Sequence, residues 1–572
     1  MSRALAVLVA VGLSIVAPNP TSAQVAIIQR PGGQPMLPPA RDASAPKTGT
    51  AKITGRVTAA DSGQPLRKAQ VRIVAQEIRE NHTTSTDGDG KFEFKDLPAG
   101  RYQVTVSKGS FVTLQYGQSR PFEAGKPLQI ADGQAVEKVD FSLPRGAIIT
   151  GHVSDEFGDP IADIRVTPMR YQYVQGRRQL TPAGRVSTTN DIGEYRIFGL
   201  APGQYFVSAS TQTNIAAGLI DVSASDDRSG YAPSYYPGTP NVADAQRITV
   251  GLGQTLNDIN LGLTPTRLAR MSGTAIDADG KPMGGAVVVV MMRAGASISN
   301  TSGTQVKPDG TFTVANLAPG DYMIQAITPS ALTDMSGWAS GQVTIAGEDV
   351  TGVLVTGSRP TTGTGRVIVN GDAKSLPPSA IHMMATPAHP EDNLMAGMGG
   401  VTVKDDYSFE LKARPGLAII RPVTLPPGWA LKSVRQRGTD VTDSGIEFRQ
   451  NEEASGIEVE LTNQATEVSG AVTNARSEPV KDYTVVVFSR ERERWGYMSR
   501  FFQTGRPDQD GRFKVRSLPA GNYYAVALDY VEPGEASDPE FLDRVKERAI
   551  SFSLGDGEAK TVDLKIASSS SH

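Results

Sequence analysis

The sequence predicts an all-β protein built as a tandem array of about five β-sandwich modules. The main observation is a pattern that occurs four times: an Asp- and Gly-containing turn, a short strand, a Leu-x-x-Gly turn and a tyrosine. The four copies begin at Asp87, Asp191, Asp309 and Asp510, and the second turn glycine always follows the first by ten residues. A fixed interval that recurs at domain-scale distances indicates an array of similar modules. Abundant glycine (59) and proline (38) suit short strands joined by many turns.

Each copy has a clear physical interpretation. Asp-Gly is a turn dipeptide whose glycine adopts positive φ without steric cost. The residues that follow alternate between apolar and polar, as at Phe92 and Phe94, which is the period of a half-buried strand. The tyrosine, Tyr102 in the first copy, begins the next strand. We expect the leucine and the aromatic residues to fill one sandwich core.

A second mark, Thr/Ser-Gly-x-Val/Ala, opens each module. Its glycines are Gly55, Gly151, Gly273, Gly365 and Gly470. They lie roughly 100 residues apart, the size of a β-sandwich domain. We therefore divide the chain into a signal peptide (1–23), a Pro-rich linker expected to be disordered (24–49), and modules 1 to 5 at 50–145, 146–265, 266–358, 359–463 and 464–572.

Modules 2, 4 and 5 depart from the common pattern. Module 4 is degenerate, because Asp405-Asp406-Tyr407 lacks the turn glycine and Arg414-Pro415-Gly416-Leu417 lacks the leucine and the tyrosine. We expect altered loops there. Module 2 has a long Tyr-rich insertion over 211–240. In module 5, an N-cap candidate and an early proline in 537–545 predict a helix of about three turns.

The N-terminus predicts export. Met1-Ser2-Arg3 is positively charged, 4–17 is apolar but too short for a comfortable membrane span, and Thr21-Ser22-Ala23 offers small residues for cleavage. We predict a signal peptide cleaved near Ala23 and a periplasmic or extracellular protein, with a retained anchor as the alternative. No later run is apolar enough to predict a transmembrane segment in the mature chain. The absence of cysteine excludes disulfides and acyl-cysteine anchors, and the net charge of -3 argues against a nucleic-acid partner.

The combined pattern resembles the carboxypeptidase regulatory-like domain. The residues that carry the resemblance are Gly-x-Val, turn-Pro, an apolar strand, Asp-Gly-x-Phe/Tyr and Leu-x-x-Gly-x-Tyr, and they cover nearly all of 50–567. The resemblance implies a seven-stranded, transthyretin-like (prealbumin-like) β-sandwich of the carbohydrate-binding-like superfamily, in a multi-repeat exported bacterial protein. The domain is named for its place beside a zinc carboxypeptidase domain, which this chain lacks. Fold is implied more firmly than function, since one sandwich hosts many roles.

The sequence offers little for catalysis or metal binding. It has five histidines and no His-Glu-x-x-His or Gly-x-Ser-x-Gly motif, so we predict no enzyme, no cofactor and no metal site. One cluster, His382-Met383-Met384 with His389, Met395 and Met398, has ligands that suit copper. The alternative is that these methionines fill gaps in a core. Three Asp-x-Asp-Gly stretches are superficially similar to calcium loops but lack the distal glutamate, and turn chemistry explains them.

Aromatic residues are the candidate ligand contacts. Tyr231, Tyr235 and Tyr236 lie in the module 2 insertion, and Trp495 and Tyr497 lie in module 5. Exposed aromatic rings suit sugars or partner surfaces, and long loops often carry function. Trp338 and Trp429 also lie in predicted loops or strand ends, and the alternative is that all of these rings cover module junctions.

We therefore expect a non-catalytic binding protein outside the cytoplasm, whose partner is a glycan, a cell-envelope component or another protein. Carbohydrate binding is the leading specific version, and it rests on the resemblance. A structural spacer or scaffold for protein–protein interaction is the alternative. A ligand-binding protein should show one module with clustered aromatics and convergent polar groups, whereas a spacer should show five similar, featureless modules.

Overall fold

The structure is a computed structural model. It describes residues 49–75, 80–120, 122–174, 176–211, 229–294, 297–328, 337–388, 401–426, 428–496 and 498–568. All of these belong to the unit Arg41–His572. The predicted signal peptide and all but the last residue of the Pro-rich linker lie outside the described residues, as do Tyr497, His389, Met395 and Met398.

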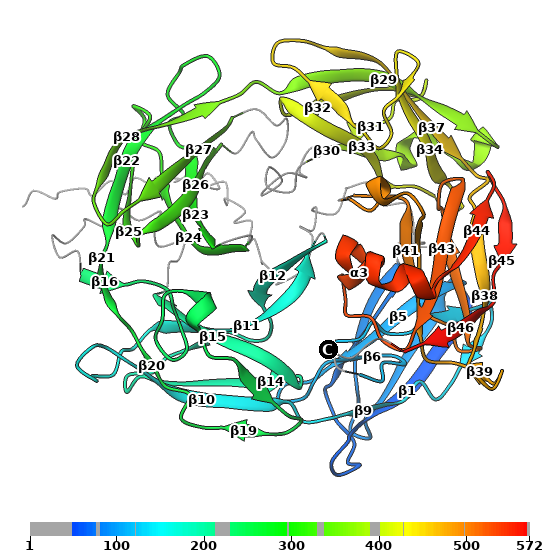
Figure 1. The fold of residues 1–572 in the computed structure, drawn as a ribbon, viewed down its shortest axis with the longest axis horizontal. Coiled ribbons are helices and arrows are strands. Elements are labelled where there is room, and N and C mark those ends of the chain that lie inside the picture. The colour runs from blue at the N-terminus through cyan, green and yellow to red at the C-terminus, as the bar shows by residue number, and fades with distance from the viewer. Residues whose placement is uncertain are drawn as a thin grey trace, which may run out of the picture. The chain divides into compact units, whose positions relative to one another are not determined.

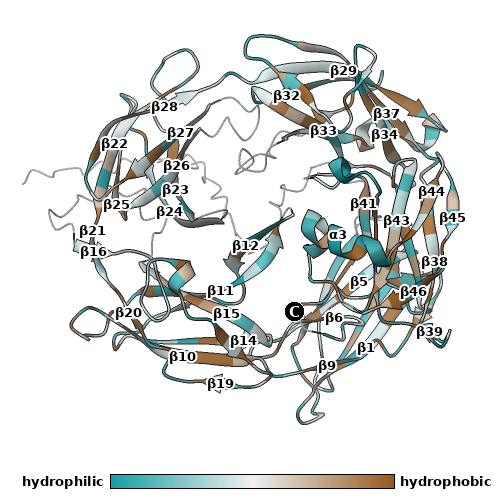
Figure 2. Cartoon of the chain, in the orientation of Figure 1, coloured by the Kyte–Doolittle hydropathy of each residue, from teal (hydrophilic) through white to brown (hydrophobic). Residues whose placement is uncertain are grey.

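The chain is all-β, as predicted, and its strands form a succession of small sheets (Figure 1). Each of the five predicted segments has its own hydrophobic cluster, formed by residues within 51–143, 147–263, 268–355, 367–461 and 468–566. Apolar residues are concentrated on the strands (Figure 2). In the part of the chain that the structure describes, no helix is both long and apolar enough to span a membrane.

Module 1 places its core between two sheets. Its strands are β1 Ala51–Ala59, β2 Gln70–Ala75, β3 Glu80–Ser85, β4 Lys91–Leu97, β5 Gly100–Ser107, β6 Leu114–Gln115, β7 Leu128–Ile130, β8 Ala135–Val136 and β9 Phe141–Leu143. One sheet has the order β4-β1-β8, with β9 also pairing with β1. The other has the order β3-β2-β5-β6, with β7 on β5. The core draws on both sheets, for example on Ile53 and Val71.

Module 2 repeats this plan and adds strands from its insertion. Its strands are β10 Ala147–Ser154, β11 Ile164–Val174, β12 Arg177–Pro182, β13 Ser187–Thr188, β14 Glu194–Leu200, β15 Gly203–Thr211, β16 Ser229–Tyr231, β17 Ser234–Tyr235, β18 Ile248–Val250, β19 Thr255–Leu256 and β20 Leu261–Gly262, with a 3-10 turn η2 at Val242–Asp244. The sheet β14-β10-β19 is joined by β20, and the sheet β12-β11-β15-β17 is joined by β13 and β18. Strand β16 pairs with β21 (Pro265–Arg267), which leads into module 3.

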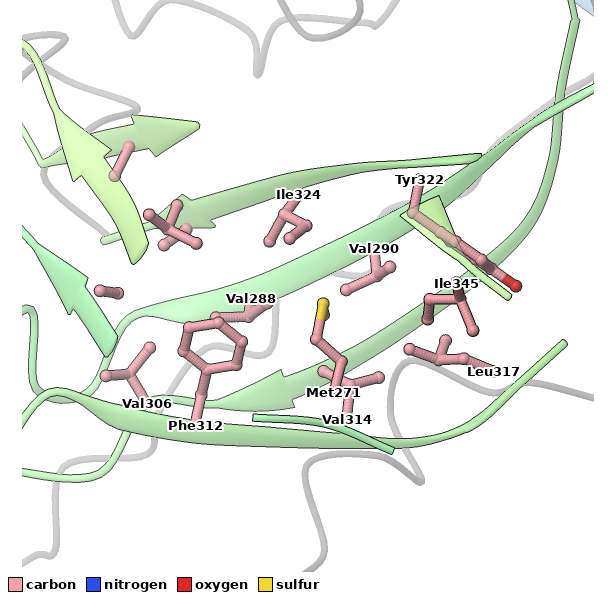
Figure 3. Packing of buried hydrophobic residues seen from close by; sticks show 14 of the residues in the cluster. Met271, Val288, Val290, Val306, Phe312, Val314, Leu317, Tyr322, Ile324 and Ile345 are labelled. Carbon is pink, nitrogen blue, oxygen red and sulfur yellow. The ribbon is translucent and has the colours of Figure 1, made fainter. Parts of the chain in front are cut away.

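Modules 3 and 4 follow, each with a longer last strand than modules 1 and 2 have. The strands of module 3 are β22 Ala269–Ile276, β23 Val287–Ala294, β24 Ser297–Gln305, β25 Thr311–Leu317, β26 Gly320–Ile327, β27 Trp338–Ile345 and β28 Val350–Gly357, and they belong to one sheet. Its core includes Met271, Val290 and Phe312 (Figure 3). Module 4 has β29 Thr361–Asn370, η3 Ala373–Ser375, η4 Pro378–Ala380, β30 His382–Pro387, β31 Val401–Thr402, β32 Ser408–Ala413, β33 Gly416–Thr424, β34 Ala430–Gln436, β35 Thr439–Asp440, β36 Ile446–Phe448 and β37 Ala454–Thr462. Its sheets have the orders β32-β29-β37-β34-β35 and β31-β30-β33-β36.

Module 5 carries the predicted helix, which is shorter than expected. Its elements are β38 Glu467–Thr473, β39 Pro479–Val480, β40 Thr484–Ser489, η6 Arg492–Arg494, β41 Phe502–Gly505, β42 Arg512–Arg516, β43 Gly521–Leu528, η7 Glu535–Ser537, α3 Pro539–Val545, η8 Lys546–Arg548, β44 Ile550–Leu554, β45 Ala559–Thr561 and β46 Leu564–Ala567. The N-cap Asp538 accepts a hydrogen bond from the Glu540 amide, and Pro539 starts α3. The helix has 7 residues rather than three turns, because the chain tightens into the 3-10 turn η8 at Lys546.

The glycine that opens each module has a packing role. In every module the first strand pairs in parallel with the last one, as β1 does with β9 and β22 with β28. A Cβ atom at Gly55 would lie 2.1 Å from the Val139 carbonyl oxygen, and one at Gly273 would lie 2.0 Å from that of Val353. The same holds at Gly151, Gly365 and Gly470. Only glycine lets the two backbones approach this closely.

The tyrosine of the repeated pattern closes the second turn. Its hydroxyl donates a hydrogen bond to the carbonyl oxygen four residues earlier, and we call this contact the tyrosine clasp. The clasps are Tyr102 to Pro98 (2.8 Å), Tyr205 to Ala201 (2.8 Å), Tyr322 to Ala318 (2.8 Å) and Tyr523 to Pro519 (2.6 Å). All four rings are buried. The Leu-x-x-Gly-x-Tyr spacing thus satisfies a carbonyl group that the tight turn would leave unpaired.

Candidate functional site

The predicted contact residue Tyr235 lies in a small hydrophobic cluster rather than in an exposed loop. It belongs to β17, which pairs with β15, and its side chain packs with Met169, Leu180 and Phe206. We call these four residues the outer cluster. Burial raises the pKa of the Tyr235 hydroxyl. The ring is 7% exposed, so its role in this structure is to pack the insertion against the sheet.

The neighbouring tyrosines are partly exposed and lie near a module junction. Tyr231 is in β16, opposite Pro265 of β21, and its hydroxyl donates to Glu156 over 3.4 Å. Tyr236 packs against the module 2 core, and its amide donates to the Val207 carbonyl. The intervening Ala232 packs against the core of module 3. This part of the insertion therefore connects modules 2 and 3.

Tryptophans proposed as surface residues are buried as well. Trp495 is 2% exposed, stacks edge-to-face on Phe488 and donates its indole N–H to the Ser489 carbonyl. It belongs to a second cluster of module 5, between the sheet and α3. Trp338 and Trp429 are also buried, and the Arg414 guanidinium lies 3.9 Å from the Trp338 ring centre. Tyr497 lies outside the described residues.

The residues considered for metal binding that the structure describes include a core methionine and aspartates that stabilise turns. Met383 lies fully buried in the module 4 core, which agrees with the use of methionine as a core filler. The first aspartate of each Asp-x-Asp-Gly stretch accepts two backbone N–H groups of its own turn, as Asp87 does from Asp89 and Lys91. Within the described ranges, no three His, Asp or Glu side chains form a group that could hold a metal ion.

A cavity of about 250 Å³ lies on module 2, next to the outer cluster. It is lined by Arg170, Tyr171, Arg178, Gln204, Phe206, Arg247 and Glu532. Six of these seven residues belong to module 2, and Glu532 belongs to module 5. The site therefore combines two aromatic rings, three guanidinium groups, an amide and a carboxylate.

Strand alternation explains how Tyr171, Gln204 and Phe206 meet, whereas Arg170, next to Tyr171 in β11, points to the other side of that strand. In β15, Tyr205 and Val207 face the module 2 core, so Gln204 and Phe206 face the opposite side of the sheet. Phe206 pairs with Met169 of β11, and two residues further along, Tyr171 pairs with Leu180 of β12. The β11–β12 hairpin is long, and this length carries Arg178 beyond the core.

The charged groups of the cavity are held by aromatic contacts. Arg178 lies 4.7 Å from the Tyr171 ring centre, and Arg247 lies 5.9 Å from that of Phe206. Arg170 lies 3.6 Å over Phe122 and donates through Nη2 to Glu532 Oε1 at 2.5 Å. Burial raises the pKa of the nearby Tyr205 hydroxyl to about 12, although the Arg170 charge acts in the opposite direction.

None of the cavity residues was predicted from the sequence. They come from four separate segments, and only strand pairing brings Arg178, Phe206 and Arg247 together. One local signal was available, the alternation Tyr171-Gln172-Tyr173 followed by Gly176-Arg177-Arg178, which is typical of an exposed hairpin with aromatic and basic residues.

Comparisons with known proteins identify one region by family. Residues 52–144 match the family model of the carboxypeptidase regulatory-like domain. The chain is also 23% identical over 309 residues to Colossin-A of Dictyostelium discoideum, a match that spans 50% of this chain and 2% of that protein.

Solved structures resemble the chain at low overall similarity. A streptococcal ancillary pilin shows 13% identity, with 54% of this chain and 98% of that chain covered and a TM-score of 0.19. Two B repeat units of the collagen-binding protein of Staphylococcus aureus show 13% identity, 72% and 100% coverage and a TM-score of 0.13. Residues 52–144 therefore both match the carboxypeptidase regulatory-like domain and form a β-sandwich with its own core.

Proposed function

We propose that this chain is a non-catalytic binding protein that acts outside the cytoplasm and holds a glycan or another cell-envelope component on module 2. The observation that carries the proposal is the cavity beside the outer cluster, where Tyr171 and Phe206 meet convergent polar groups. Pockets with aromatic walls and a few placed polar groups are the usual form of small-ligand sites.

A glycan-array screen of residues 24–572 tests this function. Saturable binding to one glycan class should weaken strongly in Tyr171→Ala, because the variant removes an aromatic wall of the cavity. Phe157→Ala is the matched control, since Phe157 is an exposed aromatic residue (82%) of the same module on a turn outside the cavity. No binding by the unmodified chain, or equal loss in both variants, would contradict the proposal.

A spacer or scaffold for protein–protein interaction is the second candidate, and the junctions between modules favour it. Strand β16 pairs with β21, and Ala232 packs against the module 3 core. Such contacts stiffen a chain of modules. If the array shows no glycan binding, a pull-down from envelope extract that captures a saturable, reproducible partner would favour this function instead.

A further inference from the structure

The module 2 cavity has the charge of an anion site. Three arginines line it, against the single carboxylate of Glu532. Guanidinium groups bind carboxylates through short, charge-assisted and often bidentate hydrogen bonds. The lining therefore has an excess of two positive charges in a recess that also offers aromatic surface.

The arginines are held in place before any ligand binds. Arg178 and Arg247 lie over the rings of Tyr171 and Phe206, which restricts the long side chains. The third, Arg170, is held over Phe122, and its Nη1 is buried without a hydrogen-bond partner among the described residues. This nitrogen has almost no accessible surface, so a ligand would contact Arg170 through its other guanidinium nitrogens.

The structure itself shows which chemistry fits. The carboxylate of Glu532 enters the cavity from module 5 and pairs with Arg170 at 2.5 Å. It pairs with one arginine of the lining, Arg170, and the lining contains two more, Arg178 and Arg247. A sugar ring bearing its own carboxylate would bring an oxyanion to these two groups while its face lies against Tyr171.

We propose that the module 2 cavity binds an acidic sugar, a glycan that carries carboxylate groups, through Arg178 and Arg247 with Arg170 as a further donor. This inference rests on the proposed function and narrows its ligand class. The carboxylate of the sugar determines the specificity, and the aromatic walls add affinity that depends little on which sugar is bound.

The test is isothermal titration calorimetry of the full chain with oligogalacturonate and with its methyl ester, which is the same sugar without the charge. We expect the acid to bind at least about tenfold more tightly, the effect of one lost charge-assisted hydrogen bond. Arg178→Gln/Arg247→Gln should abolish this preference. Arg185→Gln/Arg196→Gln is the matched control, because both arginines also lie over a ring, that of Phe198, in the same module. It should keep the preference.

A second variant tests the role of module 5. Glu532→Gln removes the only carboxylate of the lining, and we expect it to tighten acid binding severalfold while leaving ester binding unchanged. Thermal unfolding of each variant checks that the fold is retained. Equal affinity for acid and ester, equal losses in both double variants, or no acid binding would each overturn the inference. In any of these cases, binding of neutral glycans on the array would leave the proposed function standing.

Discussion

Modules 3 and 4 are neighbours that build their turns differently. In module 3 the turn glycine Gly310 has φ +86°, and the Tyr322 hydroxyl donates to Ala318. In module 4 the corresponding turn position is Tyr407, with φ +63°, and its hydroxyl donates to the Leu376 carbonyl at 2.9 Å. Module 4 also has no tyrosine after Gly416, so it has no tyrosine clasp.

What the two modules share is the glycine of the first strand. A Cβ at Gly273 or at Gly365 would lie 2.0 Å from a carbonyl oxygen of the last strand. The comparison indicates a hierarchy: the parallel pairing of first and last strands requires its glycine, whereas the clasp can be replaced. Tyr407 shows one replacement, because its hydroxyl bonds to the 3-10 turn η3 and its C-cap Leu376 instead.

The largest expected effect is the loss of the first-strand glycine. Gly273→Ala and Gly365→Ala should each destabilise their own module by about 3 kcal/mol, because the clash is with backbone that cannot rotate away. Hydrogen exchange read by mass spectrometry should show faster exchange in module 3 or module 4 respectively. Gly88→Ala is the control, since its Cβ would meet open space. Unchanged hydrogen exchange of module 4 in Gly365→Ala would contradict the proposed hierarchy.

High pH should lower the stability of the modules that have a tyrosine clasp more than that of module 4. Burial raises the pKa of Tyr205 to about 12, and burial together with the Glu80 charge does the same for Tyr102. An unfolded tyrosine has a pKa of about 10, so the clasps stabilise fully below about pH 10 and lose this contribution as the pH rises towards about 12.

Calorimetry between about pH 8 and about pH 11.5 measures this dependence. Transitions of modules 1 and 2 should fall steeply above about pH 10, and Tyr102→Phe/Tyr205→Phe should flatten that fall. The double variant is informative because phenylalanine keeps the ring and removes only the hydroxyl group that titrates. An unchanged slope in this variant would mean that other groups govern the alkaline transition.

At neutral pH the clasp itself should contribute less. Tyr322→Phe removes one hydrogen bond and leaves the Ala318 carbonyl unpaired, so we expect a loss of about 1 kcal/mol in module 3. Tyr116→Phe is the control, because it removes a hydroxyl from a partly buried ring of module 1 without touching a clasp. Hydrogen exchange in β26 measures the effect, and equal changes in both variants would contradict a specific role of the clasp.

The comparison also explains what the sequence could and could not predict. Turns and strands depend on neighbours in the chain, so the patterns that contain Gly55, Phe92 and Tyr102 predicted these elements correctly. The tyrosine of the clasp and the glycine of the first strand can be read in the sequence, but the residues that they contact, Pro98 and Val139, are identified only by the fold.

The candidate site was missed for a related reason. Tyr235 and Trp495 were predicted at the surface because they lie in segments without a core period, yet each covers a second cluster on the outer face of a sheet. Arg178 and Arg247 are 69 positions apart, and only the order β12-β11-β15, with β18 on β15, brings them to one cavity. Cross-strand neighbours of this kind have no signature in spacing.

The smallest expected effect concerns a single turn residue that differs between modules 1 and 5. Gly63 and Ser477 occupy the turn after the first strand, with φ +66° and +62°, and a Cβ at Gly63 would meet no atom within 4 Å. The two positions share this backbone conformation and differ in whether the residue has a Cβ atom. Ser477→Gly should stabilise module 5, and Gly63→Ser should destabilise module 1, each by about 1 kcal/mol, because positive φ strains a residue that has a Cβ. Slower exchange in Ser477→Gly and faster exchange in Gly63→Ser would show that turn strain dominates, whereas the reverse signs would assign the effect to the entropy of the unfolded chain.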